Sequence, residues 1–354
     1  MQEVLEEWRP VVDEMLEQLL PREVDDAYLT RYFGDASFQY DTRAIQRALA
    51  DPVWDLLDRG GKRWRPIVSL LFMDGFGINP TAYVEYACIP EILHNGTIIV
   101  DDVEDGAEIR RGEPAIHHVY GIDVALNAGN ALYFLPLKIV EHNPGNLDAD
   151  RRLALYDMLM HELNRTHLGQ GMDIHWHNKP NIDIKEEHYL EMCACKTGCL
   201  GRMTARIASI IADQPREVEA AAASYAEQMS VAFQIGDDVL DIRHTLNQAG
   251  DFGKAFGNDI REGKKTLIVL HSMKHADAPQ RNWLTDILST KDNSREEIIE
   301  AIDILQSTDS LTYATEKARE FARQAQADIA DIGLTKEREG ELAAFADFVI
   351  DRDM

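Results

Sequence analysis

Two acidic clusters with the same spacing are the residues best suited to do chemistry in this chain. Each has the pattern D-D-x-x-D and each follows an apolar stretch; the aspartates are Asp101, Asp102, Asp105, Asp237, Asp238 and Asp241. On a helix, the first and last aspartate of each cluster lie on one face. Carboxylates that close repel one another unless a cation lies between them. Mg²⁺ suits such a place, because it keeps ligand positions for water and substrate phosphates.

A single acidic cluster in a chain with 62 Asp and Glu residues is usually a solvated face. Two clusters of one spacing, each closing an apolar segment, are much harder to explain in that way. The pattern therefore predicts that the clusters form facing walls of one metal and phosphate site.

Basic residues follow or precede these clusters, although the chain is strongly acidic. The turn at 60–66 carries three cations in four residues, and its glycines let the backbone approach an anion. Arg110 and Arg111 follow the first cluster and offer forked donors that match phosphate oxygens, although on their own they would simply neutralise nearby acids. A lysine-rich stretch at 253–266 follows the second cluster, and Lys196 lies in an otherwise apolar helix. This arrangement predicts a substrate that carries diphosphate.

Composition excludes several classes of protein. A net charge of −26 argues against nucleic-acid binding and against adhesion to anionic membranes. No stretch of 18 apolar residues is present, and the N-terminus lacks the features of a signal peptide, so a cytoplasmic protein is expected. Four cysteines do not make a disulfide framework. Cys193, Cys195 and Cys199 have an unusual spacing for zinc, and small buried packing residues are the preferred interpretation.

The elements that must position these residues have helical periodicity almost throughout. The predicted helices cover 2–20, 42–58, 66–76, 80–104, 121–142, 149–175, 184–212, 215–243, 264–275, 295–307, 309–331 and 336–352. No Pro, Gly or Ser-rich linker divides the chain. We therefore expect one all-α domain over residues 1–354, with its motif-bearing core at about 60–266.

The order of the motifs resembles that of trans-type isoprenyl (polyprenyl) diphosphate synthases, which are head-to-tail prenyltransferases. The motifs are G-G-K-R-x-R-P at 60–66, D-D-x-x-D at 101–105, R-R-G-x-P at 110–114, G-Q-x-x-D at 169–173, K-T at 196–197, F-Q-x-x-D-D-x-x-D at 233–241 and G-K at 253–254. Each motif is weak alone, but the ordered set is specific. One departure is Val100, where the family often has His. The resemblance implies an isoprenoid synthase-type helical bundle around a central cavity, similar to geranylgeranyl diphosphate synthases, and a homodimer.

The resemblance also implies residue roles. Asp101 and Asp105 would hold two Mg²⁺ ions and Asp237 a third, supported by Asp102, Asp238 and Asp241, with Mn²⁺ as a substitute. The allylic diphosphate would be bound by Arg110, Gln170, Lys196 and Lys254, and Lys264 would be a further substrate-binding residue. Isopentenyl diphosphate would be bound by Lys62, Arg63, His94 and Arg111. Backbone carbonyls, Thr197 and Gln234 would stabilise the carbocation that forms when the allylic C–O bond ionises.

Three alternatives remain open. A terpene cyclase shares the fold and the first acidic motif but has a different second motif and lacks the basic isopentenyl site. A non-catalytic partner subunit of a heteromeric synthase usually loses aspartates or basic residues, whereas all six aspartates are present. A shorter-chain, farnesyl-type synthase differs only in product length.

Product length depends on the turn before the first cluster. Gly96 and Thr97 are small where short-chain members of the family have aromatic residues, so a product of twenty carbons or somewhat more is expected. On this view the two residues face the path of the growing tail, and Gly96→Phe would shorten the product. Alternatively, a bulky residue of another helix, such as Phe72, Tyr133 or Phe134, sets the floor.

Overall fold

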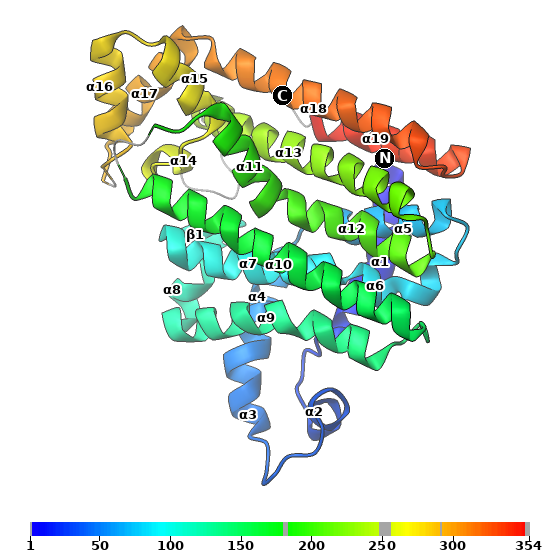
Figure 1. The fold of residues 1–354 in the computed structure, drawn as a ribbon. Helices are drawn as coiled ribbons and strands as arrows, with labels where there is room; N and C mark the ends of the chain where they lie inside the picture. Colours follow the sequence, from blue (N-terminus) through cyan, green and yellow to red (C-terminus); the bar gives the residue numbers. More distant parts are fainter. Residues whose placement is uncertain (1, 180–182, 248–255, 291, 351–354) are drawn as a thin grey trace. The chain divides into compact units, whose positions relative to one another are not determined.

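Helices make up nearly all of the regular structure in the computed structural model, which describes residues 2–179, 183–247, 256–290 and 292–350 (Figure 1). Within these residues the strands are a two-residue antiparallel pair, in which Ile109 lies opposite Pro114 and Arg110 opposite Glu113. The expected all-α fold is confirmed. No described helix is long and apolar enough to cross a membrane.

The chain forms two compact units, which we describe separately. The first contains Met1–Leu159 and Thr204–Gln214, and the second contains Met160–Met203 and Pro215–Met354. Two helices contribute to both units: α10 (Ala149–His177) and α12 (Gly198–Ile211). That the whole chain acts as one domain stays a prediction.

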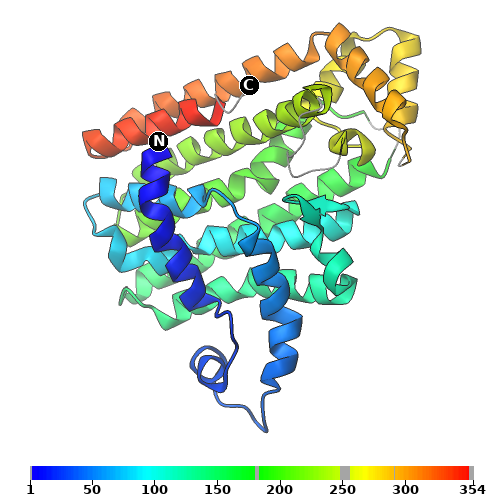
Figure 2. The ribbon, with the colours of Figure 1, turned by 180° about the vertical axis from the view of Figure 1, so that it is seen from behind.

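The first unit carries the first acidic cluster. Its elements are α1 (Gln2–Leu19), α2 (Asp26–Phe33), α3 (Thr42–Ile45), the π-helix η1 (Gln46–Ala50), α4 (Asp51–Asp58), α5 (Trp64–Gly75), the 3₁₀ helix η2 (Pro80–Tyr83), α6 (Val84–Ala87), α7 (Ile89–Asp105), β1 (Ile109–Arg110), β2 (Glu113–Pro114), α8 (Ile116–Tyr120) and α9 (Ile122–His142). Helix α7 packs along α9, and α1 crosses α5 and α6 (Figure 2).

The second unit carries the second acidic cluster on its longest helix. Its elements are α11 (Glu186–Lys196), α13 (Arg216–Asn247), α14 (Asn258–Arg261), α15 (Leu267–His275), α16 (Ala278–Ile287), α17 (Arg295–Ser307), α18 (Ser310–Asp328), the 3₁₀ helix η3 (Ile329–Asp331) and α19 (Lys336–Ile350). Helix α13 packs against α18 and α19 over much of its length (Figures 1 and 2).

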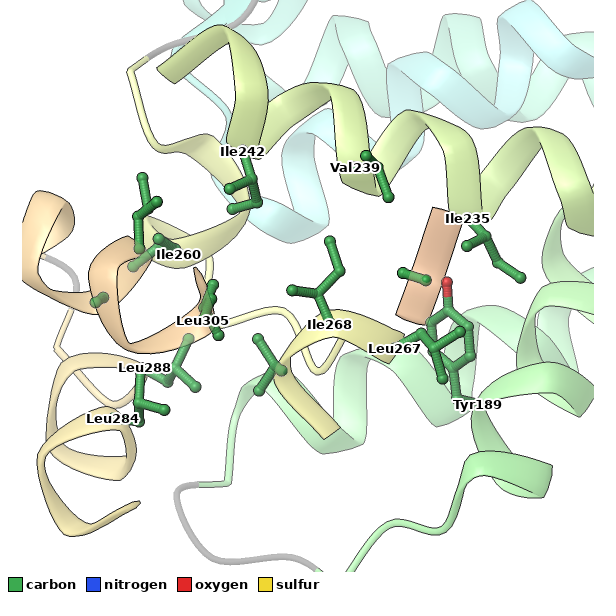
Figure 3. Close-up of a cluster of buried hydrophobic side chains, with 14 of the residues drawn as sticks. Tyr189, Ile235, Val239, Ile242, Ile260, Leu267, Ile268, Leu284, Leu288 and Leu305 are labelled. Carbon is green, nitrogen blue, oxygen red and sulfur yellow. The ribbon is translucent and has the colours of Figure 1, made fainter. Parts of the chain in front are cut away.

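One apolar face of α13 fixes the orientation of its acidic face. Ile235, Val239 and Ile242 recur at helical spacing and point toward α15, where Leu267 and Ile268 are also buried (Figure 3). Side chains at these positions share one face of a helix. The aspartates of the second cluster lie between these apolar residues in the sequence. Burial of the apolar residues therefore determines where the carboxylates lie.

Two predicted helices are interrupted, and several short helices were not predicted. The segment 80–104 is divided into η2, α6 and α7, because Pro90 begins a new helix after Cys88. The segment 184–212 is divided at Thr197, between α11 and α12. Helices α2, α8, α14 and α16 were missed, since most are too short to show helical periodicity. The β-branched run Thr97–Val100 is helical as expected.

Candidate active site

The first acidic cluster forms the last turn of α7. Asp101 and Asp105 are partly buried and lie on the same face of the helix, whereas Asp102 is fully buried. Arg110 donates to Asp102 Oδ1 from Nε at 2.8 Å and also from Nη2. Burial raises the pKa of Asp102, and the Arg110 guanidinium opposes that shift. The helix then ends at Gly106, whose left-handed φ of 68° lets its N–H donate to the carbonyl of Asp102.

The two arginines after this cluster lie on a tight hairpin. Arg111 and Gly112 form its two-residue loop with φ values of 54° and 81°, as a type I′ turn requires. Arg111 donates from Nη1 to the carbonyl of Leu56 at 2.8 Å and from Nη2 to Asn95 Oδ1 at 3.3 Å. The hairpin thus directs Arg110 toward the end of α7 and Arg111 toward its middle.

Four arginines influence the protonation of His94, which lies two turns before Asp101 on α7. Burial lowers the pKa of His94, and the charges of Arg65, Arg111, Arg110 and Arg63 lower it further. Burial also lowers the pKa of Arg111 to about 10. The charges of these guanidinium groups favour an anion near His94, although carboxylates pair with Arg63 and Arg110.

Lys62 and Arg63 of the glycine-rich turn have different environments. Lys62 is exposed, whereas Arg63 is 5 % exposed and forms ion pairs with Glu91 and Asp13, both at 3.0 Å. A Cβ atom on Gly61, where φ is 146°, would lie 2.9 Å from Arg63 Nη1, so the turn requires glycine there. Arg63 therefore supports the fold of this region in addition to its predicted role, and Lys62 is the cleaner probe of anion binding.

The second acidic cluster lies within α13, and protein donors hold Asp238 and Asp241. Asp238 accepts from the Tyr189 hydroxyl at 2.7 Å and from Gln234 Nε2 at 3.0 Å. Asp241 Oδ2 accepts from the backbone N–H of Asp259 at 3.3 Å. Asp238 and Asp241 are buried, while Asp237 is partly exposed. Of the three, Asp237 is the carboxylate most open to a ligand.

Thr197 extends this network, because its hydroxyl donates to Gln234 Oε1 at 2.9 Å. Two residues that the sequence assigned to cation stabilisation, Thr197 and Gln234, are thus in direct contact with each other and with Asp238. Tyr189 was not predicted: it lies 49 residues from Asp238, and no spacing in the sequence signals the contact. Burial raises the pKa of Tyr189, so its hydroxyl stays protonated as a donor.

A lysine pair converges on Asp173 in the same unit. Lys196 Nζ lies 2.7 Å from Asp173 Oδ2, and Lys264 Nζ lies 3.3 Å from the same oxygen. A Cβ on Gly169 would lie 2.4 Å from the backbone nitrogen of Lys196, so only glycine lets α10 approach the end of α11 this closely. This close contact explains why the first residue of the G-Q-x-x-D motif, Gly169, is glycine. Gln170 is partly buried on the same helix, and Lys254 lies outside the described residues.

One carboxylate oxygen of the first acidic cluster is placed where a divalent cation or its water would compensate it. Asp102 Oδ2 is buried and has no hydrogen-bond partner among the described residues, which is expensive unless a ligand compensates it. Within the described part of the chain, no group of three or more His, Cys, Asp or Glu is arranged to hold a metal. Hard cations such as Mg²⁺ complete their ligand sets with water and substrate oxygens, so few protein carboxylates suffice.

The cysteine cluster has packing contacts in the second unit. Cys193, Cys195 and Cys199 are all buried. Cys199 Sγ lies 2.8 Å from the Thr166 hydroxyl, and Cys195 Sγ lies 3.2 Å from Glu191.

The expectation that Gly96 faces the path of a growing chain is wrong. A Cβ atom on Gly96 would lie 2.8 Å from Leu132 Cβ and 2.9 Å from the carbonyl of Gly129, both on α9. Gly96 is therefore a point of close packing between α7 and α9, and Gly96→Phe would separate the helices rather than fill a cavity. Among the alternative floor residues, Phe134 is 68 % exposed at the surface, whereas Phe72 and Tyr133 are buried.

We expect Gly96→Ala to lower the free energy of unfolding by about 1–3 kcal/mol, because the added methyl overlaps backbone and Cβ atoms that cannot turn away. Urea denaturation monitored by circular dichroism measures the change. Gly340→Ala is the matched control, since a Cβ there meets nothing within 4 Å and alanine favours helix. Equal stability of the two variants would contradict the close packing of α7 on α9.

The chain is similar to known proteins over most of its length. The family model described as polyprenyl synthetase matches residues 46–305. A short chain isoprenyl diphosphate synthase of Methanocaldococcus jannaschii is 35 % identical over 84 % of this chain and 87 % of its own length. A geranylgeranyl diphosphate synthase of Saccharolobus solfataricus is 29 % identical over 86 % of this chain and 91 % of its own. The crystal structure of geranylgeranyl pyrophosphate synthetase from Pyrococcus horikoshii superimposes with a TM-score of 0.83 at 27 % identity, covering 99 % of this chain and 98 % of that one.

Proposed function

The chain belongs to the polyprenyl synthetase family. From this premise we propose a role for each site residue in head-to-tail prenyl transfer. The protein is a prenyltransferase that makes a polyprenyl diphosphate. We propose that it condenses isopentenyl diphosphate with an allylic diphosphate. The observation that carries this proposal is the hairpin that brings Arg110 and Arg111 against α7, next to the carboxylates at the end of that helix.

The aspartates divide into ligands and supports in this proposal. Asp101 and Asp105 hold two Mg²⁺ ions and Asp237 holds a third, because these carboxylates are the more exposed members of their clusters. Asp102, Asp238 and Asp241 are supporting ligands, and Arg110, Tyr189 and the backbone of Asp259 keep them in place. The family uses divalent metal to bind diphosphate. When bound, the ions neutralise the diphosphate and make it a better leaving group.

The cationic side chains form two diphosphate sites in the proposal. Arg110, Gln170, Lys196, Lys254 and Lys264 hold the allylic diphosphate. Lys62, Arg63, His94 and Arg111 hold isopentenyl diphosphate. Asp173 holds the ammonium groups of Lys196 and Lys264 close together. In the proposal both ammonium groups bind the diphosphate that leaves the allylic substrate.

After the diphosphate is bound, the reaction needs side-chain dipoles that stabilise a carbocation, and it needs no protein nucleophile. When the allylic C–O bond ionises, the Thr197 hydroxyl oxygen and the Gln234 carboxamide stabilise the positive carbon with their negative ends. The double bond of isopentenyl diphosphate then attacks this carbon. The proton lost from the product passes to the departing diphosphate, so no side chain has to act as a strong base.

We propose a product of twenty carbons or somewhat longer, supported by the names of the relatives and by the small Thr97 one turn before Asp101. Incubating the purified protein with isopentenyl diphosphate, an allylic primer and Mg²⁺, followed by chromatography of the dephosphorylated products, tests the reaction and the length together. Elongated prenols are expected. A fifteen-carbon product would indicate a farnesyl-type enzyme, a cyclic hydrocarbon would indicate a terpene cyclase, and no product would indicate a partner subunit.

A homodimer is the assembly that we propose, and its support is the exposure of large apolar side chains on α8 and α9. Val119 on α8 and Ile122 and Phe134 on α9 are 50 %, 58 % and 68 % exposed. Exposed large apolar side chains are candidate contacts of a protein interface. Light scattering after size-exclusion chromatography gives the mass in solution. A cytoplasmic location stays a prediction.

We expect Lys62→Ala to raise the KM for isopentenyl diphosphate about tenfold or more, because the change removes a charge-assisted hydrogen bond to the bound diphosphate. The KM for the allylic substrate should change by less than about twofold. Steady-state kinetics with each substrate varied in turn measures both constants. Equal increases in the two constants would contradict separate diphosphate sites.

A further inference from the structure

A buried arginine outside the recognised motifs holds the hairpin that carries Arg110 and Arg111. Arg59 follows the last residue of α4, and its side chain is 6 % exposed. Its Nη1 atom donates to the carbonyl of Arg110 at 3.1 Å and to the carbonyl of Pro114 at 2.8 Å. These carbonyls belong to the two different strands, β1 and β2. One guanidinium nitrogen therefore ties both strands of the hairpin to α4.

Asp55 orients this guanidinium from one helical turn away. Its Oδ1 atom accepts from Arg59 Nε at 2.9 Å and from Nη2 at 2.8 Å. The three nitrogens of Arg59 are thus divided between one carboxylate and the hairpin carbonyls. A lysine cannot reproduce this arrangement, because it has one nitrogen and no planar fork.

The hairpin cannot be rigid through its own contacts alone. Each strand has two residues, and isolated two-stranded ribbons are marginally stable. Arg111 also adopts a left-handed φ of 54°, which a residue with a side chain adopts only at a cost. Arg110 and Arg111 attach it to the helices through their side chains, and Arg59 is the residue that holds its strand carbonyls from outside.

We propose that Arg59 is a positioning residue for both diphosphate sites, acting through the backbone of the hairpin that presents Arg110 and Arg111. The proposal rests on the function proposed above, in which Arg110 serves the allylic substrate and Arg111 serves isopentenyl diphosphate. Arg59 touches neither substrate. Loss of its two hydrogen bonds lets the hairpin move, and both diphosphates then bind less tightly.

An open cleft makes this proposal testable by chemical rescue. The cleft has a volume of about 690 Å³ and is lined by Asp55, Asp58, Arg59, Arg111, Glu113, Pro114 and Val119. Truncating Arg59 to alanine leaves a space the size of a guanidinium ion, and this space opens into the cleft. The Asp55 carboxylate and the two hairpin carbonyls remain there as acceptors. A guanidinium ion from solution has the charge, the planarity and the donors to bind them.

The experiment compares Arg59→Ala with the wild-type protein in millimolar guanidinium chloride, and in urea at the same concentration as an uncharged control. We expect Arg59→Ala to raise the KM of both substrates about tenfold while kcat changes by less than about threefold. Guanidinium should restore most of the loss and urea should not. Arg59→Lys should fall between wild type and Arg59→Ala. Arg22→Ala is the control, because Arg22 likewise pairs with a carboxylate of α4, Asp58, and its ion pairs with Asp58 and Glu17 lie outside the hairpin.

A second readout does not depend on turnover. Hydrogen exchange of the amides in 106–115 should become faster in Arg59→Ala and return toward the wild-type rate with guanidinium. Unchanged KM values in a folded Arg59→Ala, or hairpin exchange equal to wild type, would overturn the proposal. So would KM values that guanidinium fails to lower. If the wild-type protein itself gave no prenyl product, the proposed function would fail, and hydrogen exchange would still decide the role of Arg59.

Discussion

Asp101→Asn and Asp237→Asn are each expected to lower turnover by at least about 10³-fold while leaving the helices intact. Asparagine keeps the shape of aspartate but removes the negative charge that a divalent cation needs. These two carboxylates are partly exposed, whereas Asp102 and Asp238 are buried and engaged by protein donors. Removing one of several neighbouring negative charges also relieves repulsion, so the free energy of unfolding should not fall. Single-turnover kinetics with Mg²⁺ and thermal unfolding measure the two effects separately.

Asp347→Asn is a suitable control, because Asp347 lies on α19 and accepts a hydrogen bond from Gln326 at 2.7 Å. Its turnover should match that of the wild type. Chelation of divalent ions should abolish wild-type turnover, and added Mg²⁺ should restore it. Turnover close to wild type in either Asp101→Asn or Asp237→Asn would contradict the proposed ligands.

The fold class was predictable from the sequence because long helices repeat their apolar pattern many times. Helix α13 has 32 residues and α10 has 29, so the helical period dominates any local preference. Short elements lack this signal. Helix α2 has 8 residues and buries two of them, Leu29 and Tyr32, and the hairpin at 109–114 depends on two positive φ angles. The two compact units depend on contacts between distant segments of the chain. Such a division could not be predicted, because no linker sequence marks it.

The site was predictable where its residues lie close together in sequence and unpredictable where contacts join distant segments. The D-D-x-x-D spacing predicts that Asp101 and Asp105 share a face, and the helical end of α7 bears this out. Tyr189 on Asp238 and Arg59 on the hairpin carbonyls depend on packing between elements, which spacing does not encode. Gly96 illustrates the opposite error. The small size of Gly96 predicts space for the product in that turn. Its lack of a side chain instead lets α9 approach α7 closely.

The second large effect is expected at a buried ion cluster in the second unit. Arg202 donates from Nε to both oxygens of Glu162, at 3.1 and 3.0 Å, and from Nη1 to Glu227. Its Nη1 atom also donates to the carbonyl of Ala194 at 3.0 Å, two residues before Lys196. Burial alone would lower the pKa of Arg202, and the carboxylates of Glu162 and Glu227 raise it. The cluster therefore connects α10, α12 and α13 and fixes the end of α11.

Arg202→Met should lower the free energy of unfolding by about 3–5 kcal/mol, because Glu162 is 1 % exposed and loses its cation without gaining water. The melting temperature should fall by roughly 10 °C. Calorimetry measures this loss if unfolding is reversible. Since the carbonyl of Ala194 also loses a donor, binding of the allylic substrate through Lys196 should weaken in the same variant.

A double variant separates the burial of an unpaired charge from the loss of packing. Glu162→Leu in the Arg202→Met background removes the buried carboxylate that Arg202→Met alone leaves without its cation. Glu227 can turn toward water, because its side chain is 31 % exposed. The double variant should therefore be more stable than Arg202→Met alone, because well-packed apolar groups can replace a buried ion pair at little cost. If the two changes instead lowered stability additively, the cluster would contribute through its shape rather than through its charges. The affinity for the allylic substrate should stay weak in both variants, since neither one restores the hydrogen bond to Ala194.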